Sequence, residues 1–129
     1  MEVVLDTNAY SDWVRLGLWG QEVAGAAKVW LPAIVIGELF HGFRRGTRFK
    51  RNERVLEEFL SQSQVEVLEV DLEAARVFGE FVDFLQKRGT PLPSNDIWIA
   101  AGVLVKGAVL LTSDRHFGKL PQVRVAVQG

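Results

Sequence analysis

The sequence contains no cysteine and only two histidines, His41 and His116. Without cysteine, a disulfide-bonded scaffold, a thiolate zinc site and a thiol nucleophile are all excluded. Two histidines are also too few for a metal site built from three histidines of one chain. Any metal binding by this chain therefore falls mainly to carboxylates, which favour hard cations.

Long hydrophobic runs are lacking as well. The longest uncharged apolar runs, residues 29–37 and 97–105, hold nine residues each, whereas a helix that spans a bilayer needs about 20. The first six residues, Met-Glu-Val-Val-Leu-Asp, lack the basic segment and the long apolar core of a signal peptide. We therefore expect a cytoplasmic protein without a membrane segment.

No repeat, low-complexity tract or linker interrupts the 129 residues. Two separate cores of about 65 residues each would both be marginally stable. The composition, 48% hydrophobic and 24% charged, is that of an ordinary globular protein. We therefore treat residues 1–129 as one domain.

The formal net charge is −1, yet the charges are unevenly distributed. Residues 41–54 contain six basic side chains and one acid, Glu53. The basic residues are Arg44, Arg45, Arg48, Lys50, Arg51 and Arg54. A basic stripe in an otherwise acidic protein suggests a polyanionic partner that binds at one place.

Hydrophobic patterning predicts alternating strands and helices. Strands are expected at residues 3–5, 65–70, 108–112 and 123–127, and helices at 33–40, 54–60, 72–88 and 97–105. Two of the strands are apolar on both faces, which is typical of a parallel sheet covered on both sides. We therefore predict an α/β three-layer sandwich, with a central parallel sheet flanked by helices and a strand order left open.

Four acids stand at positions where a ligand site is expected. Asp6 directly follows the first strand, and Asp114 comes two residues after the strand that ends at Thr112. Parallel sheets bind ligands beyond the carboxyl ends of their strands. Glu38 and Asp96 instead lie within or beside strongly apolar segments, where an unpaired carboxylate is costly.

Each acid also has a purely structural interpretation. The three aspartates precede helical turns and would stabilise them as N-caps, by about 1 kcal/mol each. Glu38 could instead pair with Arg44 or Arg45, although that spacing is poor on a helix. Taken together, four converging carboxylates would repel one another and raise their pKa values. A divalent cation removes this repulsion, and an oxygen-only site favours Mg²⁺ or Mn²⁺ over zinc.

Four segments together resemble one known family. They are residues 5–8 (Leu-Asp-Thr-Asn), 37–39 (Gly-Glu-Leu), 96–101 (Asp-Ile-Trp-Ile-Ala-Ala) and 112–117 (Thr-Ser-Asp-Arg-His-Phe). In order and spacing they are similar to PIN-domain nucleases, and most of all to the VapC-type ribonuclease toxins of toxin–antitoxin pairs. The resemblance covers nearly the whole chain.

The resemblance implies roles for particular residues. The family's four metal-binding acids fall on Asp6, Glu38, Asp96 and Asp114. Its small hydroxyl residue falls on Thr112, and Thr7 and Asn8 would orient Asp6. The implied activity is endoribonucleolytic cleavage by water activated on Mg²⁺ or Mn²⁺, which leaves a 5′-phosphate and a 3′-hydroxyl. The residues alone do not decide whether Asp6 or Asp96 accepts the proton of that water.

The resemblance also implies partners: an RNA substrate, a second copy of the chain in a homodimer, and a cognate antitoxin whose inserted segment blocks the acidic site. Four tryptophans fit either a hydrophobic core or such a subunit interface. Arg44, Arg45 and Arg48 are candidates for RNA binding, with Phe43 and Phe49 as candidates for base stacking. The alternative for this stripe is a solvated helix end.

Two other functional classes stay open. A PIN nuclease that processes RNA or acts on DNA would keep the same site without a toxin role. A receiver-like phosphoacceptor domain has a similar length, but it requires paired acids after the first strand, and here Thr7 and Asn8 follow Asp6.

Overall fold

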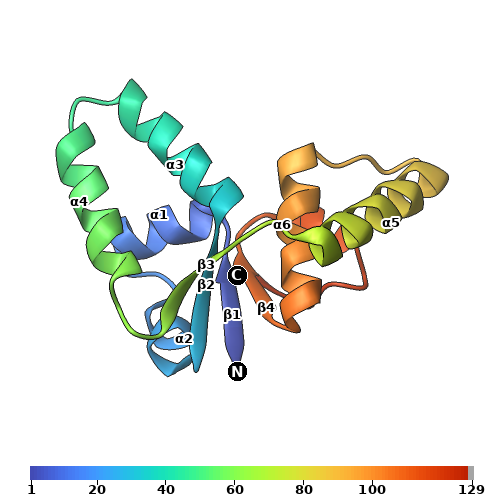
Figure 1. Ribbon diagram of the computed structural model, residues 1–129, viewed down its shortest axis with the longest axis horizontal. Coiled ribbons are helices and arrows are strands. Elements are labelled where there is room, and N and C mark those ends of the chain that lie inside the picture. The colour runs from blue at the N-terminus through green and yellow to red at the C-terminus, as the bar shows by residue number, and fades with distance from the viewer. Residues whose placement is uncertain (128–129) are drawn as a thin grey trace.

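A computed structural model of the protein describes residues 1–127; the last two residues of the predicted domain lie outside this range. Five short strands form one sheet in the order β3-β2-β1-β4-β5, and every neighbouring pair is parallel. Figure 1 labels the first four strands. The strands are β1 (Glu2–Leu5), β2 (Lys28–Pro32), β3 (Val65–Leu68), β4 (Val109–Thr112) and β5 (Val125–Val127). The parallel sheet confirms the predicted fold class.

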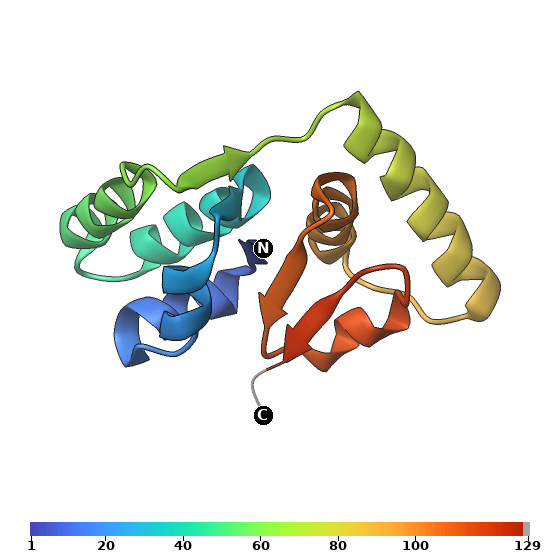
Figure 2. The same ribbon diagram turned by 90° about the horizontal axis from the view of Figure 1, so that it is seen from below.

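Helices cover both faces of the sheet. They are α1 (Thr7–Leu16), α2 (Gly20–Gly25), α3 (Ala33–Arg45), α4 (Phe49–Leu60), α5 (Leu72–Arg88), α6 (Ser94–Lys106) and the short 3₁₀ helix η1 (Arg115–Lys119). Figure 2 shows α1 to α4 on one side of the sheet and α5, α6 and η1 on the other. Right-handed crossovers impose this arrangement, because the chain adds strands first on one side of β1 and then on the other. No helix within residues 1–127 is long and apolar enough to span a membrane.

The elements begin and end where local chemistry favours it. The side chains of Asp6 and Asp71 accept the backbone N–H groups of Ala9 and Ala74, so both are N-caps. Gly89 and Gly107 end α5 and α6 at φ values of 66° and 61°, which only glycine adopts at little cost.

Strand β2 and helix α2 were absent from the sequence prediction, and helix α1 was indicated only by its capping residue, Asp6. Strand β2 is a central strand, but its apolar residues continue without a break through Pro32 into α3, so it lacks a clear period of its own. Helix α2 has six residues, too few for a periodic signal. Helix α4 also begins at Phe49 rather than at residue 54.

The core lies between the sheet and its two helical layers. Val4, Leu5, Leu110 and Leu111 of the central strands are essentially inaccessible to solvent. The small residues 100–102 of α6 are buried too, and they let this helix approach the sheet closely.

Packing within the chain accounts for the four tryptophans. Trp19 and Trp30 are buried, Trp13 packs on Phe59, and Trp98 stacks on Phe78 at a centroid distance of 3.9 Å.

Candidate active site

The order of strands reverses between β1 and β4. Strands β2 and β3 lie on one side of this pair and β5 lies on the far side of β4. Leu5 is in register with Leu111, so the next residues, Asp6 and Thr112, lie side by side at the carboxyl edge. This switch point is where open parallel sheets bind ligands.

Asp6 is only 5% exposed, and both of its carboxylate oxygens accept hydrogen bonds. The N–H of Ala9 donates to Oδ1 at 2.8 Å, and the hydroxyl of Thr112 donates to Oδ2. Burial is the main influence on the pKa of Asp6 and raises it above the usual value, although the two hydrogen bonds act in the opposite direction. Asp6 is therefore an N-cap and also a fixed member of the site.

Thr112 connects two of the predicted acids. Its hydroxyl, besides donating to Asp6, accepts the backbone N–H of Asp114 at 2.9 Å. The carboxylate of Asp114 in turn accepts the N–H of His116 at 2.8 Å and caps η1. The N-cap interpretation of Asp114 thus holds alongside its place in the site.

Glu38 is oriented by Thr7 rather than by an arginine. The hydroxyl of Thr7 donates to Glu38 Oε1 at 2.6 Å, across the contact between α1 and α3. The proposed pairing of Glu38 with Arg44 or Arg45 is wrong, because within residues 1–127 neither arginine forms an ion pair with it. The expectation that Thr7 orients Asp6 is also wrong, since its hydroxyl serves Glu38. Asn8 lines the site without a hydrogen bond to Asp6 in the described part of the chain.

Asp96 lies in the first turn of α6, where Pro93 and not Asp96 is the N-cap residue; the capping interpretation of Asp96 is therefore wrong. Burial raises its pKa above the usual value. Other carboxylates raise it further; in decreasing order they are those of Asp114, Glu38 and Asp6. The electrostatic influence of all three on Asp96 indicates that the four acids form one negatively charged group.

One cavity of about 170 Å³ contains the whole group. Its lining residues are Asp6, Thr7, Asn8, Glu38, Asp96, Ile99 and Asp114. No lysine or arginine is among them. Four carboxylates from four distant segments therefore share one small space at the carboxyl edge of the sheet.

The donor set of this cavity fits a hard divalent cation, because it offers carboxylate oxygens and no sulfur. As the side chains stand, no three histidines, cysteines, aspartates or glutamates within residues 1–127 are placed to hold a metal ion. The hydrogen bonds from Thr7 and Thr112 explain part of this, since they orient Glu38 and Asp6 towards hydroxyl groups. Each carboxylate oxygen retains a second lone pair for a ligand.

His116 lies beside the cavity, next to Asp114, a position that was not anticipated. Its Nδ1 lies 3.2 Å from Asp114 Oδ1, and a proton on this imidazole would lower the pKa of Asp96. Its position two residues after Asp114 was the only signal in the sequence.

A second, larger cavity of about 340 Å³ continues from the acidic one, because both include Thr7 and Glu38 in their walls. It runs between α1, α3 and α4 and is lined by apolar residues such as Leu39, Phe43 and Val55. This groove leads from the carboxylates along α3 towards its basic end.

The predicted RNA-binding arginines lie at that end, which we call the basic arm: the C-terminal part of α3, the connection and the start of α4, residues 44–51. Arg44, Arg45 and Arg48 are all exposed. Phe43 and Phe49 pack against each other and against Phe40, and the Arg44 guanidinium lies 4.7 Å from the Phe49 ring centroid. These aromatic rings therefore hold α3 to α4, which leaves the arginines as the groups offered to a polyanion.

Comparison with known proteins assigns the family. The model of the PIN domain family matches residues 3–123, so the chain belongs to this family. Within it, the chain groups with the VapC nucleases. It is 31% identical over 100 residues to the tRNA(fMet)-specific endonuclease VapC of Salmonella typhimurium, covering 77% of this chain and 74% of that protein. It is 28% identical over 128 residues to ribonuclease VapC2 of Haemophilus influenzae, covering 96% of each.

Solved structures agree with this assignment. The DNA-bound VapBC structure from Salmonella typhimurium contains a chain with a TM-score of 0.87 and 27% identity, at 98% coverage of both chains. A chain of the Rickettsia felis VapBC2 structure, bound to a DNA fragment of its promoter, reaches a TM-score of 0.89 over the full length of both at 21% identity. Membership of the PIN family overturns the receiver-like alternative.

Proposed function

We propose that this chain is the toxin of a toxin–antitoxin pair, an endoribonuclease that hydrolyses RNA with Mg²⁺ or Mn²⁺ held by Asp6, Glu38, Asp96 and Asp114. The observation that carries the proposal is the single cavity that these four carboxylates line without a basic side chain. Its place at the switch point of the sheet and the similarity to VapC ribonucleases support it. We take residues 1–129 as one PIN nuclease domain.

The bound cation would lower the pKa of an attacking water and neutralise charge on the scissile phosphate. The carboxylates of Asp6 and Asp96 have different surroundings, which suit them to different roles. Asp6 is held in place from both sides by Ala9 and Thr112. Asp96 forms no hydrogen bond within the described residues, and its pKa is raised. We therefore assign Asp96, rather than Asp6, as the group that accepts the proton of the water.

The test is the cleavage rate of Asp6→Asn and Asp96→Asn in the presence of Mg²⁺. Both changes keep the shape of the side chain and remove a charge, so each should lower the rate at least about 100-fold. Asp83→Asn is the matched control, because Asp83 lies on the surface of α5, where it pairs with Lys87. Cleavage at the wild-type rate in both site variants would contradict the proposal.

RNA is the substrate class that the Salmonella relative supports, because that protein is a tRNA(fMet)-specific endonuclease. Such an enzyme meets its substrate in the cytoplasm. We also propose an antitoxin that covers the acidic cavity. The similar solved structures from Haemophilus influenzae and Salmonella typhimurium are VapBC structures, and a third, from Mycobacterium tuberculosis, is a member of the VapBC family of toxin–antitoxin systems. A homodimer completes the proposed assembly, and light scattering at micromolar concentration tests it.

The alternative is a PIN nuclease that processes RNA or cuts DNA without a toxin role. Expression of the chain alone discriminates between the two. A toxin arrests growth unless its antitoxin is present, whereas a processing enzyme does not.

A further inference from the structure

A second cationic surface lies on the side of the acidic cavity away from the basic arm. It consists of Lys87 and Arg88 at the C-terminal end of α5, and Arg115 and Lys119 in η1. We call it the η1 surface. No pattern in the sequence indicates this surface, because its two parts are separated by more than 25 residues and neither is a basic run.

The η1 surface begins at the rim of the cavity. Arg115 directly follows Asp114, whose carboxylate lines the cavity and caps η1. The basic arm belongs to the helical layer of α1 to α4, while α5 and η1 belong to the opposite layer (Figure 2). The carboxylates lie between the two, with Glu38 on the side of the arm and Asp96 on the side of α5.

Contacts within the chain fix the η1 surface in place. Lys119 Nζ donates to the backbone oxygen of Pro91 at 3.3 Å, which ties η1 to the connection between α5 and α6. The guanidinium of Arg88 lies 4.7 Å from the centroid of the Phe84 ring. Lys119 is thus held by the backbone and Arg88 by an aromatic ring, rather than by acidic partners.

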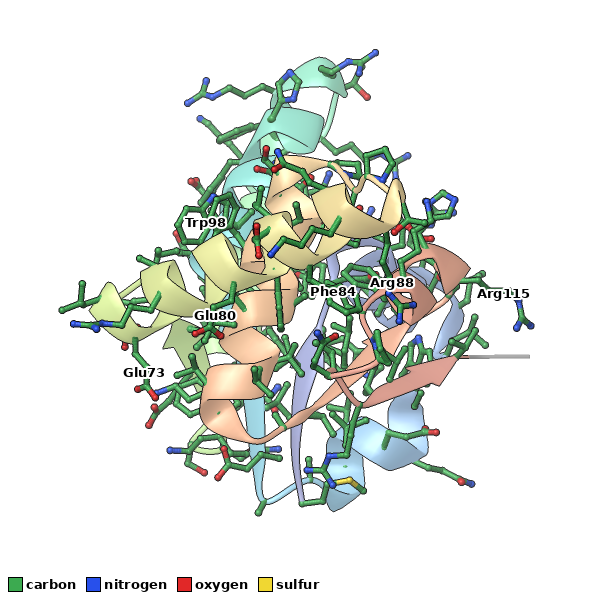
Figure 3. The ribbon with its side chains drawn as sticks, turned by 90° about the vertical axis from the view of Figure 1, so that its right-hand side faces the viewer. Glu73, Glu80, Phe84, Arg88, Trp98 and Arg115 are labelled. Carbon is green, nitrogen blue, oxygen red and sulfur yellow. The ribbon has the colours of Figure 1, made fainter. Side chains whose placement is uncertain are left out.

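The charges of this surface are largely uncompensated. Within residues 1–127, Arg88, Arg115 and Lys119 form no ion pair, and only Lys87 has one, with Asp83. Figure 3 shows Arg88 and Arg115 on one side of this face, and Glu73 and Glu80 on the other. The C-terminal end of α5 and η1 therefore present basic side chains on the same side of this face, and Arg115 directly follows Asp114 of the cavity.

We propose that the η1 surface binds backbone phosphates of the RNA on one side of the scissile bond, while the basic arm binds phosphates on the other. This inference rests on the proposed function. A cavity with four carboxylates repels a polyanion, so an RNA that crosses it needs cations on both sides. The acidic cavity and its two flanking cationic surfaces meet this requirement.

The test measures RNA binding by Arg88→Gln/Arg115→Gln in an Asp96→Asn background, which prevents turnover. The probe is a labelled single-stranded RNA of about 20 nucleotides, titrated at several KCl concentrations. Loss of two phosphate contacts should reduce the steepness of log K against log salt by about 1.4 and the affinity by about 25-fold at roughly 0.1 M salt. Arg76→Gln/Lys106→Gln in the same background is the control, because it removes two exposed charges away from the cavity and should leave both quantities unchanged.

If Arg88→Gln/Arg115→Gln keeps the wild-type affinity and salt dependence, or if the control loses as much affinity, the proposal that the η1 surface binds RNA is wrong.

The same measurements distinguish this proposal from the proposed nuclease function. If the wild-type enzyme binds RNA through Arg88 and Arg115 but does not cleave it, the surface stands and the nuclease proposal fails. If Asp96→Asn abolishes cleavage while the double variant binds normally, the nuclease proposal stands and the surface fails.

Discussion

Thr112 is completely buried at the end of β4, where its one hydroxyl group serves two acids. It donates to Asp6 and accepts the N–H of Asp114, so it joins the carboxyl ends of two neighbouring strands. Its hydrogen bond also opposes the rise that burial causes in the pKa of Asp6. A residue that carries no charge thus helps to keep a buried carboxylate ionised.

Replacement of Thr112 by valine keeps its shape and removes the hydroxyl. The pKa of Asp6 should rise further, so the carboxylate stays protonated to a higher pH and the acidic limb of the cleavage profile moves upward. The free energy of unfolding should fall by about 1–3 kcal/mol, because the N–H of Asp114 and an oxygen of Asp6 each lose a partner. Measurement of cleavage against pH and urea unfolding checks both effects. Thr112→Ser retains the hydroxyl and should keep the wild-type pH profile; a valine variant with that profile would refute the role.

Helix α6 carries Asp96 in its first turn and packs closely against the sheet. A Cβ atom added at Gly102 would lie 2.8 Å from Cδ2 of Leu68, which is itself buried in β3. Helix α5, by contrast, has an exposed glycine, Gly79, with open space around its Cα. Replacing each glycine by alanine therefore separates the effect of close packing at Gly102 from the general cost of a glycine within a helix.

We expect Gly102→Ala to destabilise the protein by about 1–3 kcal/mol, because Leu68 has to move within a packed core. Gly79→Ala should instead stabilise it by about 0.5–1 kcal/mol, since alanine restricts the unfolded chain and nothing opposes its methyl group. Chemical denaturation of both variants measures the difference. Stabilisation by both substitutions would show that α6 does not pack closely on β3.

The α3–α4 hairpin carries the basic arm, and three phenylalanines hold its two helices together. Arg44→Gln/Arg45→Gln/Arg48→Gln in the Asp96→Asn background should reduce the steepness of log K against log salt by about 2, because three phosphate contacts are lost. Circular dichroism should be unchanged, since the rings that join α3 to α4 remain. An unaltered salt dependence would place the RNA elsewhere.

At the scale of the whole molecule, the acidic cavity is a source of instability. The pKa values of Asp6 and Asp96 are raised in the folded protein, so the folded state binds protons more tightly than the unfolded state. The free energy of unfolding therefore decreases as the pH rises from about 3.9, the pKa of an unfolded aspartate, through the folded pKa values. Above the folded pKa values of Asp6 and Asp96, the loss in the free energy of unfolding no longer changes with pH, and a bound cation or antitoxin would offset it.

Without divalent cations at pH 7, Asp96→Asn should melt above the wild type, by about 4 °C if the lost repulsion is worth ~1 kcal/mol. Addition of Mg²⁺ should stabilise the wild type more than the variant, because ligand binding to the folded state adds to its stability. Thermal unfolding with EDTA and with Mg²⁺ gives both comparisons. Equal melting temperatures in every condition would contradict repulsion within the cavity.

The sequence by itself determined the features that depend on neighbouring residues. Asp6 and Asp71 start helices and Gly89 and Gly107 end them, and capping of this kind is legible in the sequence because it involves groups only a few residues apart. The alternation of apolar strands and helices likewise predicted the parallel sheet. The four acids were singled out because each stands at the end of an element or in an apolar segment.

The tertiary structure alone decided which of these groups meet. The hydroxyl of Thr7 donates to Glu38, 31 residues away, and that of Thr112 donates to Asp6, 106 residues away. The place of β2, the strand order and the η1 surface likewise depend on contacts between distant segments. Local patterns fix how a segment folds, but hydrogen-bond partners and shared cavities are set by the packing of the elements, on which the sequence gives no direct information.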